Sequence, residues 1–177
     1  MKKIIAFAGS NSKLSINKQL VTYAASLIEN VTVEVLDLND FDMPLYSIDL
    51  ERSMNGQPEN AHKFLKKIKE ADGLVISLAE HNGAYTAVFK NLFDWMSRIE
   101  VKTFFGKPML LMASSTGARG GLSVLTMAQD RFPRHDARLV GVFSLPKFND
   151  HFSNGAIDDL TLNKQLLTEV TKFKNAL

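Results

Sequence analysis

The sequence contains no cysteine, so the chain has no disulfide, no thiolate metal ligand and no cysteine nucleophile, and its composition fits a reducing compartment. Long hydrophobic runs are also missing. The longest unbroken apolar runs, such as Met109 to Ala113, reach about a quarter of the length that a helix needs to span a bilayer. The apolar run after the two N-terminal lysines is too short for a signal peptide and lacks a small-residue cleavage site. We therefore expect a cytoplasmic protein without a membrane segment.

Positive and negative charges are also nearly balanced. The chain has 21 Lys and Arg against 19 Asp and Glu, a formal net charge of +2, whereas a nucleic-acid-binding protein usually shows a stronger basic bias or a basic stripe. One basic cluster, Lys63, Lys66, Lys67 and Lys69, is interpreted as the solvated face of a helix. The four histidines lack the spacing of metal ligands. We expect no nucleic-acid partner and no metal site.

Short apolar runs alternate with amphipathic stretches along the whole chain. The expected strands are 3–8, 31–36, 74–79, 109–113 and 138–143. The expected helices carry apolar residues at three- and four-residue steps within 20–28, 64–71, 85–96, 125–132 and 166–173. The clearest stripe runs from Tyr85 to Met96, and we interpret it as part of the core.

This strict alternation predicts parallel strands joined by right-handed crossovers. Five such units in 177 residues predict a single α/β domain, 1–177, with a flavodoxin-like, three-layer, doubly wound fold. Its five-stranded parallel sheet has the predicted order 2-1-3-4-5. The stretch 40–59 fits neither pattern and contains Pro44, Gly56 and Pro58, so we expect a long loop there.

A sheet of this order binds ligands beyond the carboxyl ends of its strands, where the strand order reverses. The loop after the first expected strand runs from Gly9 to Asn17 and contains Ser10, Ser12 and Ser15. Hydroxyl donors beside the free N–H groups at a helix start favour an anion such as a phosphate. The alternative is a serine-rich turn with a helix cap. Neither the dinucleotide-binding glycine fingerprint nor a Walker loop is present.

Two further loops lie at the same edge of the predicted sheet. The second contains Glu80, His81, Asn82 and Gly83, where the glycine lets a flat ligand approach and the asparagine offers both a donor and an acceptor. A single loop histidine is more often a surface residue than a base. The third loop contains Ser115, Thr116, Gly117 and Gly120, and its glycines expose main-chain groups that suit the polar edge of a planar ring. A phosphate end and a flat hydrogen-bonding end together fit FMN.

Three motifs resemble the NADPH-dependent FMN reductase family, in order and spacing over nearly the whole chain. Gly9-Ser10-x-x-x-x-Ser15-x-Asn17 is similar to the GSxRxxSxN phosphate loop, Lys90-Asn91-Leu92-Phe93-Asp94-Trp95 to KNxIDW, and Ser115-x-Gly117-x-x-Gly120-Gly121 to the third flavin loop. Three positions depart from the family pattern. Ser12 stands where the family has arginine, with Lys13 one position later, and Ala79 stands where it has proline. His81 stands where the family has tyrosine, which leaves the substrate preference open.

The resemblance implies FMN as cofactor, NADPH or NADH as hydride donor, a small-molecule acceptor such as a quinone, an azo compound, a flavin or a metal oxyanion, and a homodimer or homotetramer. The expected cofactor contacts are Ser10, Ser12, Lys13, Ser15, Ile16 and Asn17 at the phosphate, and Glu80, His81, Asn82, Gly83, Ser115, Thr116, Gly117 and Gly120 near the ring. The flavin carries the chemistry in a ping-pong cycle, so we expect no catalytic side chain.

Two alternatives remain at this point. An electron carrier of the same fold would bind the cofactor without oxidising NAD(P)H, but such carriers are usually strongly acidic, unlike this chain with its net charge of +2. A flavin-free regulatory domain is the other alternative, because a fold alone does not determine a function.

Overall fold

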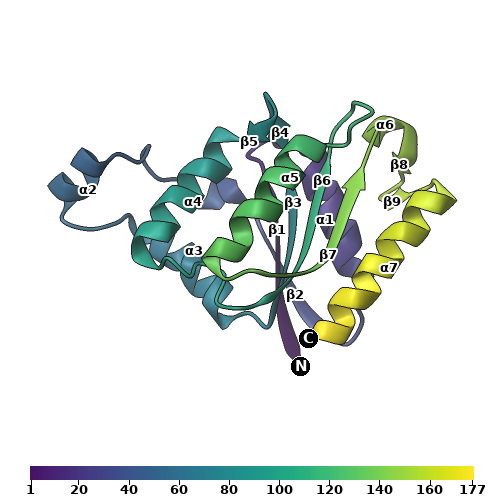
Figure 1. Ribbon diagram of the computed structural model, residues 1–177, viewed down its shortest axis with the longest axis horizontal. Helices are drawn as coiled ribbons and strands as arrows, with labels where there is room; N and C mark the ends of the chain where they lie inside the picture. Colours follow the sequence, from purple (N-terminus) through teal and green to yellow (C-terminus); the bar gives the residue numbers. More distant parts are fainter.

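A five-stranded parallel sheet forms the centre of the protein in the computed structural model, which describes residues 1–177 (Figure 1). Its strands are β1 (Lys2–Gly9), β2 (Val31–Leu36), β3 (Gly73–Leu78), β6 (Pro108–Ser114) and β7 (Arg138–Leu145). They are ordered β2-β1-β3-β6-β7, which is 2-1-3-4-5 among the strands of this sheet. The predicted fold class and strand order are confirmed.

Five helices cover the two faces of the sheet. On one face lie α1 (Ile16–Ser26) and α7 (Leu160–Ala176), and on the other lie α3 (Glu59–Glu70), α4 (Ala87–Ile99) and α5 (Leu122–Arg131). All five overlap the predicted helices. Four of them begin before their apolar stripes, and polar caps mark two of these starts, Ser15 for α1 and Asp159 for α7. α4 begins two residues later than its stripe, after its cap Thr86, because Tyr85 belongs to β5. None of the helices is both long and apolar enough to cross a bilayer.

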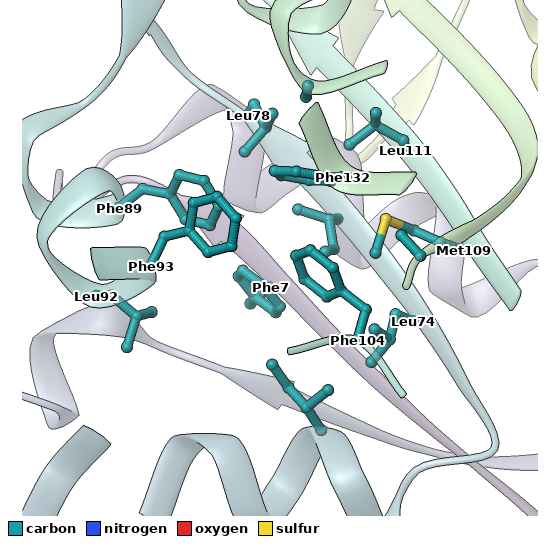
Figure 2. Packing of buried hydrophobic residues seen from close by; sticks show 14 of the residues in the cluster. Phe7, Leu74, Leu78, Phe89, Leu92, Phe93, Phe104, Met109, Leu111 and Phe132 are labelled. Carbon is teal, nitrogen blue, oxygen red and sulfur yellow. The ribbon is translucent and has the colours of Figure 1, made fainter. Parts of the chain in front are cut away.

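The core beneath α3, α4 and α5 is rich in phenylalanine (Figure 2). Phe89 and Phe93 of α4 are both buried, as predicted for the stripe on this helix, and their ring centroids lie 6.0 Å apart. Phe132 lies 4.8 Å from Phe104 by the same measure. The central strands β3 and β6 are buried along their entire length. This explains their continuous apolar sequence, because helices cover them from both sides.

Several short elements escaped the sequence analysis. They are the 3-10 helices η1 (Leu38–Asp40) and η2 (Phe132–His135), the helices α2 (Ile48–Met54) and α6 (Phe148–His151), and two hairpins, β4 (Glu80–His81) with β5 (Ala84–Tyr85) and β8 (Phe152–Ser153) with β9 (Ala156–Ile157). The prediction of a long loop over 40–59 is therefore wrong in its middle. Ser47 caps the start of α2, and Asn55 ends it in a left-handed conformation (φ 52°). A helix of seven residues is too short to show a helical apolar stripe.

The segment 41–57 forms an arm that carries α2 away from the body of the molecule (Figure 1). Two residues of the KNLFDW motif hold its base. The indole Nε1 of Trp95 and the amide of Asn91 donate to the carbonyl oxygen of Pro44 at 2.8 and 3.0 Å. The amide oxygen of Asn91 also accepts from the main-chain N–H of Tyr46 at 2.8 Å. In this structure the motif therefore fastens the arm to α4.

Candidate functional site

The three loops predicted to converge line one cleft at the carboxyl ends of β1, β3 and β6. The cleft has a volume of about 270 Å³. Its lining consists of Ser10, Ser12, Leu14, Ser15, Ile16, Asn17, Ala79, Glu80, His81, Ser114, Ser115 and Thr116. Most of the predicted cofactor contacts therefore lie together, although Lys13, Asn82, Gly83, Gly117 and Gly120 are not among the lining residues.

The start of α1 forms the phosphate-like end of this cleft. Ser15 caps the helix, because its Oγ accepts from the main-chain N–H of Lys18 at 3.2 Å. Ile16 and Asn17 are the first two helical residues, and the N–H groups at such positions lack an acceptor within their own helix. Ser10 Oγ accepts from the N–H of Ser12 at 3.2 Å and keeps its own hydrogen to donate. Hydroxyl and main-chain donors of this kind fit a phosphate group.

Asn17 contributes to the site differently from the prediction. Its side chain is 1% exposed, and Oδ1 accepts from the main-chain N–H of Ser114 at 2.9 Å and from Ser77 Oγ at 2.7 Å. Nδ2 donates to the carbonyl oxygen of Ser114 at 3.1 Å. β3 and β6 thus take up the side-chain oxygen and one amide hydrogen of Asn17. What it can offer an anion is its main-chain N–H.

The second loop is the β4–β5 hairpin. Asn82 and Gly83 form its two-residue turn with positive φ angles of 52° and 76°, the conformation that favours Asn-Gly in tight hairpins. They stand at the tip of the hairpin, while exposed His81 lies at the edge of the cleft.

The carboxylate of Glu80 accepts from the main-chain N–H of Val124 at 2.9 Å. It thereby caps α5, which begins after Gly121 and has no side-chain cap of its own. The second loop is thus tied to the start of the helix that follows the third loop. This contact occupies one oxygen of the Glu80 carboxylate, so Glu80 can offer a flat ligand its other carboxylate oxygen or its main chain.

The third loop presents Ser115 and Thr116 to the cleft, while its glycines shape the turn behind them. The carbonyl oxygen of Gly117 accepts from the N–H of Lys147 at 2.9 Å. That of Gly120 accepts from Ser144 Oγ at 3.0 Å. These bonds direct the carbonyl groups of Gly117 and Gly120 toward Lys147 and toward Ser144 in β7.

Two further residues, Lys13 and Thr86, lie on or beside these loops. Lys13 is exposed and lines a separate hollow beside the cleft. Thr86 went unnoticed in the sequence, yet its Oγ1 donates to the carbonyl oxygen of Gly9 at 2.8 Å and accepts from the N–H of Phe89 at 3.3 Å. Its position as a polar residue at the start of the apolar stripe was the available signal. Thr86 joins the first loop to the second, as Asn17 joins the first to the third.

Fold and site together define a flavodoxin-like protein with a cleft at the switch point of its sheet. The family model for NADPH-dependent FMN reductase matches residues 2–150, and the chain belongs to this family.

Curated relatives agree with this assignment, and a solved structure has the same fold. A quinone reductase of Escherichia coli (strain K12) is 33% identical over 120 residues, which cover 67% of this chain and 63% of the relative. A 2-hydroxy-1,4-benzoquinone reductase of a Burkholderia species is 37% identical over the same shares of the two chains. The chain thus spans less than two thirds of the length of these relatives. The flavoenzyme NAD(P)H:(acceptor) oxidoreductase of Paracoccus denitrificans has the same fold, with a TM-score of 0.78 at 22% identity over 99% of this chain and 97% of that one.

Proposed function

We propose that this protein binds FMN in the cleft and uses it to transfer electrons from NADPH or NADH to a small acceptor such as a quinone or an azo compound. The proposal is supported by the start of α1, which lies beside the hydroxyls of Ser10, Ser12 and Ser15 at the switch point of a sheet, in a member of the FMN reductase family. Bound FMN would supply hydride acceptance from NAD(P)H and its transfer to the acceptor in two half-reactions.

The residues of the chain would bind and orient the cofactor. Its phosphate would lie against the serine hydroxyls and the main-chain N–H groups of Ile16 and Asn17, where the helix dipole favours a negative charge. The β4–β5 hairpin and the loop at Ser115 and Thr116 would hold the polar edge of the ring, and exposed His81 would border the acceptor. No side chain is required as a general base. Family membership does not favour the electron-carrier and flavin-free alternatives.

The absorption spectrum of the purified protein mixed with FMN tests this proposal. We expect a bound flavin spectrum, bleaching by NADPH or NADH without oxygen, and recovery of the absorbance when a quinone is added. Riboflavin, which lacks the phosphate, should bind at least tenfold more weakly than FMN, because charge-assisted hydrogen bonds contribute roughly 1.5–3 kcal/mol each. FMN binding without bleaching would support the electron carrier instead, and no FMN binding would refute both functions.

We also propose that the protein assembles as a homodimer or homotetramer in the cytoplasm. The arm at 41–57 exposes Leu45, Ile48 and Met54 at 77%, 43% and 43%, an apolar surface suited to a second copy. Glu51 fixes this surface to the body, because its carboxylate accepts from Gln57 Nε2 at 2.8 Å and from Arg98 Nε at 2.9 Å. The hydrogen bond from Gln57, together with the Arg98 guanidinium, holds the pKa of Glu51 below its usual value.

Replacing Glu51 by alanine should free the arm and weaken self-association severalfold without unfolding the domain. Sedimentation at a series of protein concentrations measures the effect. Glu59→Ala is the matched control, because Glu59 is exposed and pairs only with Lys63 on its own helix at 2.8 Å. An unchanged oligomer in Glu51→Ala would show that the arm is not part of the interface, and a purely monomeric parent protein would refute the assembly itself.

A further inference from the structure

A second hollow adjoins the cleft on the side of α1. It has a volume of about 370 Å³ and lies between α1 and the β8–β9 hairpin, with Phe152 and Gly155 on the hairpin side. Leu14 and Ser15 belong to the walls of both this hollow and the cleft. Leu14 is 85% exposed and forms the boundary between them. A ligand longer than one cavity can therefore occupy both.

The hollow has two lysines in its lining, and only one of them forms an ion pair with an acidic residue. Lys13 and Lys18 are among its lining residues, and no aspartate or glutamate is. Lys18 forms an ion pair with Asp37, and its hydrogen bond lowers the pKa of that carboxyl group. Lys13 is exposed and takes part in no ion pair within the chain. Its charge is thus available to an anionic ligand.

The other walls suit a nucleoside. Thr22 and Ser26 offer hydroxyl oxygens as acceptors, because their hydrogens go to the carbonyl groups of Lys18 and Tyr23. Gln19 offers an amide, and such groups are partners for ribose and base edges. Tyr23 and Phe152 add an aromatic corner, with their ring centroids 6.0 Å apart and their planes at 84°. Hydroxyls, an aromatic surface and an unpaired lysine are together the chemistry that recognises a nucleoside phosphate.

We propose that this hollow binds the adenosine 2′-phosphate end of NADPH and that Lys13 pairs with the 2′-phosphate. This inference rests on the proposed function, because the nicotinamide must reach a flavin in the cleft while the rest of the dinucleotide passes Leu14. Lys13 is then a residue that selects NADPH over NADH. Its position outside the cleft assigns it this role in place of the FMN-phosphate contact suggested by the sequence.

The Lys13→Gln variant tests this selection. We expect kcat/KM for NADPH to fall about tenfold, mainly through a higher KM, because one charge-assisted contact is lost. The kcat/KM for NADH and the dissociation constant of FMN should not change. Lys66→Gln is the matched control, since Lys66 is an exposed lysine of α3 on the opposite face of the sheet. Equal losses with NADPH and NADH would overturn the inference, as would weaker FMN binding in Lys13→Gln.

Binding of nucleotide fragments separates this inference from the proposed function. Calorimetry on the FMN-loaded parent protein should show tighter binding of 2′,5′-ADP than of 5′-ADP, which carries the same number of phosphates, and Lys13→Gln should abolish the difference. Protein that binds 2′,5′-ADP in this way but does not oxidise NAD(P)H would refute the reductase function and leave the hollow as a nucleotide site. Equal binding of the two fragments in the parent protein would refute the 2′-phosphate site, whatever the reductase activity.

Discussion

Replacing Asn17 by alanine should lower the free energy of unfolding of the flavin-free protein by roughly 3–5 kcal/mol, because it removes one partner from three buried hydrogen bonds. The groups left unpaired would be Ser77 Oγ and both main-chain groups of Ser114, and these two residues are 0% and 1% exposed. Denaturation in urea measures the loss. FMN affinity should fall as well, because the same bonds fix the start of α1 against the third loop.

Two further variants make this prediction specific. Asn60→Ala is the same change at a position where the amide makes one exposed hydrogen bond, to the carbonyl oxygen of Asp42 at 2.8 Å, and it should cost less than about 1 kcal/mol. Ser77→Ala removes only one of the three bonds of Asn17 and should cost about 1 kcal/mol. If Asn17→Ala were no more costly than Asn60→Ala, the bridging role of Asn17 would be wrong.

The fold was predictable because its signals are local and repeated. The continuous apolar sequences of β3 and β6 reflect burial on both faces. The stripe of α4 reflects a helix that turns one face to the core, and both kinds of pattern can be recognised in the sequence. The strand order then followed from the alternation of strands and helices. The convergence of the three loops was equally predictable, since parallel strands end at one edge of the sheet.

The directions of individual side chains in the loops were not predictable in the same way. Asn17, Glu80 and Thr86 all hydrogen-bond to groups that are distant in sequence or on another loop. No spacing in the sequence shows that Glu80 caps α5 or that Asn17 turns toward β6. Such residues look like ligand contacts in a sequence because polar side chains near a helix start serve both purposes. Only the packing of the strands decides which one applies.

The position of the arm was likewise not predictable from the sequence. Asn91 and Trp95 lie in a motif that the sequence associates with the flavin family, yet their hydrogen bonds go to Pro44 and Tyr46. These contacts link residues that are 45 to 51 positions apart, and no periodic pattern in the sequence predicts them. The family motif therefore preserves, in this chain, a support for the projecting arm.

Gly120→Ala should lower the free energy of unfolding by about 2–5 kcal/mol, from two additive causes. Gly120 has a φ of +58°, a conformation that costs an L-residue about 1–2 kcal/mol. A Cβ atom would also stand 2.4 Å from Ser144 Oγ and 2.8 Å from the main-chain nitrogen of Pro146, and overpacking of this kind costs about 1–3 kcal/mol. Urea denaturation measures the sum. FMN affinity should drop too, because the displaced loop carries Ser115 and Thr116.

Gly155 provides the matched control for this prediction. Its φ is +80°, but a Cβ atom added there would meet no other atom within 4 Å, so Gly155→Ala carries only the conformational cost of about 1–2 kcal/mol. The double variant Gly120→Ala with Ser144→Ala should recover only part of the loss. It removes the contact at 2.4 Å but leaves the one with the nitrogen of Pro146, and it loses the hydrogen bond from Ser144 to the carbonyl oxygen of Gly120. Equal costs for Gly120→Ala and Gly155→Ala would mean that the end of β7 moves aside to accommodate a methyl group. A steric clash with this strand would then not explain the glycine at position 120.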